Sequence, residues 1–154
     1  MNYVRSITSA ITIADQPDPA DLQSLHAQGY TAVLNLRNDG EPEQPLTVAE
    51  EGEAVRSLGM DYHHYAIGGK PLDLAGVTDA SDFVDAHARK GGKVLVHCRK
   101  GGRAAAMVLV QQARAQGWDA PAAIARSRNL GTDVEGGLKL MVEQYLTANP
   151  PKSE

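Results

Sequence analysis

Cysteine is almost absent from this chain, because Cys98 is the only one among its 154 residues. A single cysteine cannot form an internal disulfide, so the fold does not depend on an oxidising compartment. No apolar run approaches the roughly 20 residues of a membrane span, and the first residues lack the continuous apolar core of a signal peptide. The sequence therefore predicts a cytoplasmic protein with no membrane partner.

Positive charge is also in deficit, since 15 Lys and Arg stand against 19 Asp and Glu, for a net charge of −4. Nucleic-acid binding needs a basic stripe along the surface, so no nucleic-acid partner is expected. The five histidines show no metal-ligand spacing, and we predict neither a metal nor another cofactor. The length and the 42% hydrophobic content fit one domain over residues 1–149, followed by a flexible C-terminal tail over 150–154.

Strand-like and helix-like segments alternate along the chain, which is typical of parallel strands joined by crossover helices. The pattern predicts strands at 4–7, 11–14, 31–36, 61–67 and 93–97, and helices at 19–28, 46–58 and 74–90, before a helical C-terminal third with breaks at 117–121 and 131–133. The predicted fold class is α/β, with a central, mostly parallel sheet flanked by helices.

The segment VLVHCRKGGRAAAM places Cys98 in the turn between an apolar strand and an apolar helix. The first N–H groups of a helix lack intrahelical partners and carry partial positive charge, so this turn can bind an oxyanion. Arg99, Lys100 and Arg103 add positive charge, which favours the thiolate form of Cys98 over the thiol. We therefore expect an anion site that contains a nucleophile.

The remaining loop residues suit phosphate in particular. Gly101 and Gly102 allow the backbone to curl closely around an anion. Arg103 can offer a planar, bidentate fork to two phosphate oxygens. Together with the backbone amides of residues 99–103, these groups are the predicted phosphate-binding residues.

The motif HCRKGGR resembles the phosphate-binding loop of the protein tyrosine phosphatase superfamily, whose usual form is HCxxGxxR followed by Ser or Thr. His97, Cys98 and Gly101 match that form, whereas Arg103 comes one residue early and Ala104 follows it. This short loop, with IADQPDPADLQSLHAQGYTAVLNLR upstream, resembles the beta-lactamase-hydrolase-like family, a bacterial branch with a phosphatase-like fold. The resemblance implies that Cys98 is the nucleophile, that His97 orders the loop by hydrogen bonding, and that the substrate is phosphorylated.

Two other functions are compatible with the same loop. Its Cys-x4-Arg spacing also resembles that of rhodanese-like sulfurtransferases, in which Cys98 would carry sulfur as a persulfide. A weakly active or inactive module that binds a small oxyanion is the second alternative, because Ala104 replaces the hydroxyl that normally helps the thiolate leave the phosphoenzyme. The LNLR strand and His97 favour the phosphatase-like function, which would proceed through a phosphocysteine intermediate on a phosphomonoester.

Residues that follow other strands are candidates for the same pocket, because the carboxyl ends of parallel strands meet at one edge of a sheet. Arg37 ends the LNLR strand and Lys70 follows strand 61–67, so both are expected at the pocket rim, although Arg37 fits a plain surface position equally well. Asp73 is the candidate proton donor. It also directly precedes Leu74, where a helix is expected to begin, and helix capping is the more frequent role of such a residue.

Overall fold

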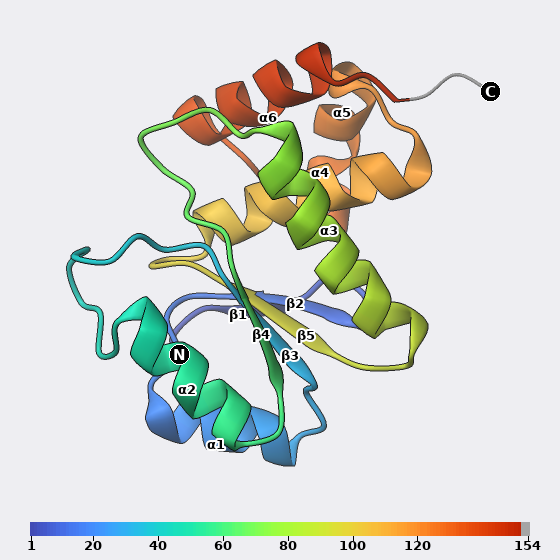
Figure 1. Cartoon of the computed structure of the whole chain (residues 1–154). Coiled ribbons are helices and arrows are strands. Elements are labelled where there is room, and N and C mark those ends of the chain that lie inside the picture. The colour runs from blue at the N-terminus through green and yellow to red at the C-terminus, as the bar shows by residue number, and fades with distance from the viewer. Residues whose placement is uncertain (152–154) are drawn as a thin grey trace.

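A five-stranded sheet forms the centre of the molecule, in a computed structural model that describes residues 1–151 (Figure 1). Its strands are β1 (Val4–Ser6), β2 (Ile11–Ala14), β3 (Ala32–Asn35), β4 (Asp61–His64) and β5 (Val94–His97), in the spatial order β1-β2-β5-β3-β4. All neighbouring pairs are parallel except β1 and β2, which pair antiparallel. The predicted α/β fold with a mostly parallel sheet is therefore confirmed. Residues 152–154 of the predicted C-terminal tail lie outside the described residues.

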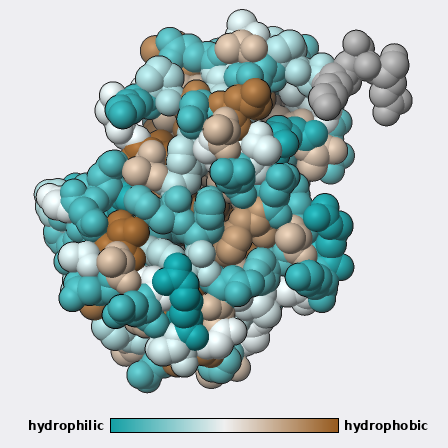
Figure 2. Space-filling view, in the orientation of Figure 1, coloured by the Kyte–Doolittle hydropathy of each residue, from teal (hydrophilic) through white to brown (hydrophobic). Residues whose placement is uncertain are grey.

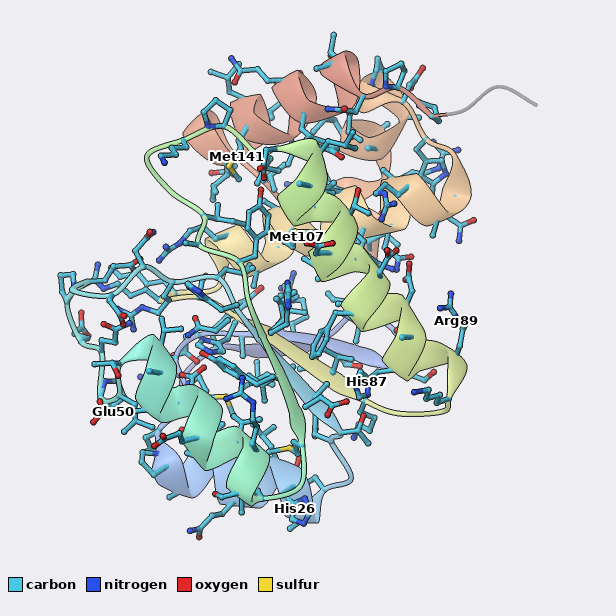
Figure 3. The ribbon with its side chains drawn as sticks, in the orientation of Figure 1. His26, Glu50, His87, Arg89, Met107 and Met141 are labelled. Carbon is cyan, nitrogen blue, oxygen red and sulfur yellow. The ribbon has the colours of Figure 1, made fainter. Side chains whose placement is uncertain are left out.

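Six helices cover the two faces of this sheet, within residues 1–151 (Figure 1). They are α1 (Pro19–Ala27), α2 (Val48–Ser57), α3 (Leu74–Arg89), α4 (Gly102–Gln116), α5 (Ala120–Leu130) and α6 (Gly136–Ala148). Helices α1 and α2 pack on one face, and α3 to α6 build the thicker layer on the other. Side chains of that thicker layer include Met107 on α4 and Met141 on α6 (Figure 3).

Strand β5 lies at the centre of the sheet and is buried on both sides, which explains why its sequence is apolar without alternation. Val94 and Val96 belong to the core beneath α3 to α6, whereas Leu95 belongs to the core beneath α1 and α2. This alternation continues past Leu95 to His97, which is buried toward α2, and Cys98, which is buried toward the thicker layer. Consecutive side chains at the end of β5 therefore pack against opposite helical layers of the molecule.

Local signals set where most helices begin. Helix α2 begins two residues later than predicted, because the Thr47 hydroxyl accepts a hydrogen bond from Glu50 N and the Glu50 carboxylate accepts one from Thr47 N. Glu50 lies at this end of α2 in Figure 3. The visible face is mostly hydrophilic, with small, separate hydrophobic patches (Figure 2). Within residues 1–151, no helix combines the length and apolar character needed to cross a bilayer.

Candidate active site

The cysteine loop, residues 98–103, begins at the carboxyl end of β5 and runs into the first turn of α4. Gly101 is the N-cap of α4 and has a φ of 104°, a conformation that L side chains rarely adopt. A Cβ atom at this position would also lie 2.5 Å from Cδ2 of Tyr3. Both the backbone angle and the packing of the Tyr3 ring therefore require glycine here.

The sulfur of Cys98 lies inside this loop. The residue is only 1% exposed, and the N–H of Gly101 donates to Sγ at 3.0 Å. Because Gly101 has no side chain, no side-chain hydrogen bond caps the amino end of α4. The turn thus directs one backbone amide, that of Gly101, toward the sulfur, as an oxyanion-binding turn requires.

Arg103 is held by a carboxylate that sequence reasoning missed. Its Nη1 and Nη2 donate to Oε2 and Oε1 of Glu41 at 2.9 and 2.7 Å, and Nη1 also donates to the carbonyl oxygen of Ile67 at 3.0 Å. None of these bonds uses Nε. Glu41 therefore binds the Nη1–Nη2 edge of the guanidinium and leaves the edge that includes Nε available to other partners. The pKa of Arg103 is raised, mainly by its hydrogen bonds to Glu41 and further by the nearby Cys98.

Glu41 in turn belongs to a segment that we call the acidic loop, residues 38–44. Its carboxylate accepts from Asn38 N at 2.7 Å in addition to the bonds from Arg103. The hydrogen bonds from Arg103 outweigh the cost of burial and lower the pKa of Glu41 from 4.5 to about 2. Glu41 is therefore an ionised partner of the cysteine loop at neutral pH.

Arg37 lies beneath the acidic loop and is fully buried. Its guanidinium donates to Oε1 of Gln16 at 2.8 Å, to the carbonyl oxygen of Glu43 at 3.0 Å and to that of Pro42, and its Nε donates to Oε1 of Glu41 at 3.3 Å. Sequence reasoning expected this residue at the pocket rim. The structure buries Arg37 fully, and three of the four oxygen acceptors around its guanidinium belong to the acidic loop.

A second ion pair joins the same two loops. The carboxylate of Glu43 accepts from Nη2 of Arg99, and Glu43 has a φ of 59°, the one positive φ at a non-glycine residue in the described chain. Glu43 is 75% exposed and Arg99 is 32% exposed, so this pair faces solvent, in contrast to the Glu41 pair. The pKa of Glu43 is lowered by the hydrogen bond from Arg99, then by the charges of Arg99 and of nearby Lys100.

A third carboxylate, that of Glu51, contacts His97 on the opposite face of the sheet. Its Nε2 lies 2.8 Å from Oε2 of Glu51 on α2, and its Nδ1 lies 3.3 Å from the carbonyl oxygen of Cys98. Burial alone would raise the pKa of Glu51, but the charge and hydrogen bond of His97, with a 2.8 Å bond from Gln16, lower it. The signal for Glu51 was present in the sequence, since it lies one helical turn before buried Val55 on the apolar face of α2.

The two remaining candidates lie on the segment between β4 and α3. Lys70 is exposed there. Asp73 is the N-cap of α3, where Oδ1 accepts from Gly76 N at 3.2 Å and from the Tyr65 hydroxyl at 2.8 Å. The capping role that the sequence favoured for Asp73 is therefore present.

Other features of the described residues lie away from this loop. A cavity of about 540 Å³ lies where the end of α4 meets the end of α6, with Trp118, Tyr145 and Asn149 in its lining, and it includes no residue of the cysteine loop. Nowhere in residues 1–151 do three or more His, Cys, Asp or Glu side chains come together as metal ligands would.

The sheet order, with a Cys-x4-Arg loop at the carboxyl end of its central strand, defines a protein tyrosine phosphatase-like fold. Residues 3–115 match the family described as beta-lactamase hydrolase-like protein, phosphatase-like domain, and the chain belongs to that family.

Curated relatives agree with this assignment. The beta-lactamase hydrolase-like protein of Agrobacterium fabrum is 38% identical over 114 residues, which cover 73% of this chain and 25% of that protein. Dual specificity protein phosphatase 26 of Mus musculus is 31% identical over 113 residues, which cover 70% of this chain and 50% of the relative. The chain thus spans a quarter to a half of the length of these relatives.

Solved structures show the same fold at lower sequence identity. Tk-PTP in its active form superposes with a TM-score of 0.76 at 19% identity, over 96% of this chain and 97% of that one. PTPMT1 in complex with PI(5)P superposes with a TM-score of 0.75 at 16% identity, over 96% of this chain and 99% of that one. The resemblance to a phosphatase fold that the sequence indicated is confirmed.

Proposed function

We propose that this chain is a cysteine-dependent phosphatase that hydrolyses a phosphomonoester through a phosphocysteine intermediate on Cys98. In the first step the thiolate attacks phosphorus, so that the S–P bond forms while the bond to the leaving oxygen breaks and that oxygen takes a proton. In the second step water attacks phosphorus, loses a proton, and releases inorganic phosphate and the thiolate.

The observation that carries this proposal is the arrangement of donors around Sγ of Cys98. The Gly101 N–H at 3.0 Å stabilises negative charge on the sulfur. Arg103 is fixed by Glu41 at one end, which leaves its Nε edge for the equatorial oxygens that gain charge in the transition state. His97 supports the loop from the opposite layer through the Cys98 carbonyl.

Proton transfer to the leaving oxygen is the least developed part of this site. Asp73 is our candidate donor, but its Oδ1 already accepts hydrogen bonds from Gly76 N and the Tyr65 hydroxyl at the start of α3, so the carboxyl group is engaged as a helix cap. Substrates whose leaving oxygen departs without a proton should therefore react fastest. We expect aryl phosphates to be hydrolysed much faster than alkyl phosphates.

The test is hydrolysis of p-nitrophenyl phosphate by the unaltered chain and by Cys98→Ser, Arg103→Lys and Asp73→Asn. Loss of turnover in Cys98→Ser, with inorganic phosphate still bound in calorimetry, supports the proposal. Arg103→Lys keeps the charge but not the fork, and a fall of about 100-fold or more in kcat/KM is expected. If Asp73 donates the proton, Asp73→Asn lowers kcat for an alkyl phosphate more than for p-nitrophenyl phosphate.

A parallel assay with thiosulfate and cyanide separates the alternatives. Thiocyanate formation that depends on Cys98, without hydrolysis of any phosphomonoester, would overturn the proposal in favour of sulfur transfer. Phosphate binding without either reaction would overturn it in favour of an oxyanion-binding module.

A further inference from the structure

We propose that the side chain of Arg99 forms a second anion site beside that of Cys98. This second site takes a second phosphate group of the same substrate molecule, and the Glu43 carboxylate occupies it in the free protein. The inference deepens the proposed function, on which it rests for turnover, and it names a substrate class: a small molecule that carries two phosphate groups.

The first observation is that Arg99 is only half satisfied. Glu43 accepts from Nη2, whereas Nε is buried and has no hydrogen-bond partner among the described residues. A buried donor without an acceptor is costly, and the Nε and Nη2 atoms form one edge of the guanidinium. A phosphate with one oxygen on each of these atoms would satisfy the edge that a single carboxylate oxygen leaves incomplete.

The second observation is that Glu43 can leave at little cost. Its side chain is 75% exposed, and ion pairs at such exposed positions contribute little to stability, because water competes for both charges. Its backbone is held at a positive φ by Arg37, which binds the carbonyl oxygens of Pro42 and Glu43. The backbone anchor is thus separate from the carboxylate, and the carboxylate can swing away while the acidic loop stays in place.

The third observation is the spacing of the two anion positions. Glu41 and Glu43 are two residues apart on the acidic loop, and they bind Arg103 and Arg99 respectively. The two guanidinium groups are thus held by one short segment, so a phosphoryl group on Sγ and an anion on Arg99 can belong to one small molecule. Exposed Lys100 lies near enough to Glu43 to lower the pKa of its carboxyl, so it would add charge to the same site.

Calorimetry on the Cys98→Ser chain tests this binding without turnover. The probes are an inositol monophosphate and an inositol bisphosphate whose phosphates are on adjacent carbons. We expect the bisphosphate to bind about tenfold more tightly, because it gains charge-assisted hydrogen bonds to Arg99. Arg99→Gln should remove this advantage, Arg99→Lys should keep part of it, and Glu43→Gln should strengthen bisphosphate binding about threefold by removing the internal competitor.

A matched control removes the same charge elsewhere. Arg89 is exposed at the end of α3, near the amino end of β5 and therefore at the opposite edge of the sheet from the cysteine loop (Figure 3). Arg89→Gln should leave the ratio of the two affinities unchanged. Equal binding of the two probes, or an advantage that persists in Arg99→Gln, would overturn the inference.

The source of the bisphosphate is distinguished by a second arm. Phosphatidylcholine vesicles that carry the corresponding phosphoinositide are compared with the soluble probe, and tighter binding to vesicles that depends on Arg99 identifies a lipid headgroup. The proposed function fails separately, if p-nitrophenyl phosphate is not hydrolysed while the dependence of bisphosphate binding on Arg99 is still observed.

Discussion

Replacement of Glu41 by Gln tests whether an ionised carboxylate holds the cysteine loop. Glu41 Oε1 and Oε2 accept from both terminal nitrogens of Arg103, from Nε of Arg37 and from Asn38 N. A pKa lowered from 4.5 to about 2 means that folding stabilises the charged form. At about 1.36 kcal/mol per pKa unit the ceiling is about 3 kcal/mol, and because the carboxylate is partly in solvent we expect Glu41→Gln to lose about 1–2 kcal/mol at pH 7.

The sign of the pH dependence follows from the lowered pKa. The stabilisation by Glu41 is complete above pH 4.5, where the carboxyl is ionised even in the unfolded chain, and it disappears as the pH falls toward 2. The difference in the free energy of unfolding between the unaltered chain and Glu41→Gln should therefore shrink over that interval. Other carboxyl groups titrate in both proteins and cancel in the difference.

Urea unfolding at pH 7 and at pH 3 measures this difference. Glu53→Gln is the matched control, since Glu53 is an exposed carboxylate on α2 with no ion pair among the described residues. It should change stability by less than about 0.5 kcal/mol at either pH. If Glu41→Gln is as stable as the unaltered chain at pH 7, or if its deficit is the same at pH 3, the charged contact with Arg103 is not what stabilises this loop.

Two further substitutions test the support of the cysteine loop. Glu51→Leu leaves buried His97 without its carboxylate, so we expect the free energy of unfolding to fall by about 3 kcal/mol. Glu51→Gln keeps an acceptor oxygen and should lower it less. Urea unfolding at pH 7 measures both, and equal losses would show that the hydrogen bond is unimportant. Gly101→Ala must place a Cβ atom 2.5 Å from the Tyr3 ring at a φ of 104°, so we expect a loss of about 2–3 kcal/mol and of phosphate binding in calorimetry. Addition of Tyr3→Ala should recover only the packing part of that loss, because the backbone angle is unchanged; full recovery would show that the angle costs nothing.

Local patterns in the sequence were sufficient to predict the elements of the fold. The alternation of apolar strands and helices placed all five strands and the helices between them, and Gly101 and Gly102 marked the turn into α4. The sequence offered Asp73 two roles, proton donor and helix cap, and the residue does cap α3. Errors at boundaries came from side chains that act as caps, as Thr47 does at the start of α2.

The pairing of particular carboxylates with residues of the cysteine loop and with His97 could not be predicted in this way. Glu41 and Arg103 are separated by 62 positions, Glu43 and Arg99 by 56, and Glu51 and His97 by 46. No periodicity relates residues at such distances, and the acidic loop resembled an ordinary polar loop. The structure of the acidic loop depends on Arg37. This residue is buried under the loop by contacts with distant parts of the chain, which local sequence patterns do not reveal.

The carboxylates of Glu51, Glu41 and Glu43 differ most in solvent exposure, and this difference determines whether each can leave its partner. Glu51 is 1% exposed, Glu41 19% and Glu43 75%. A buried charge that loses its partner is strongly destabilising, so Glu51 must stay with His97 throughout any reaction. Glu41 keeps one end of Arg103 while the other end is available to an anion, and only Glu43 is exposed enough to yield its position. The segment between β3 and α2 thus supplies the carboxylates that pair with Arg99 and Arg103 in the free protein. Only the Arg99–Glu43 pair can open to expose its arginine, and it lies on the side that solvent, and hence a substrate, can reach.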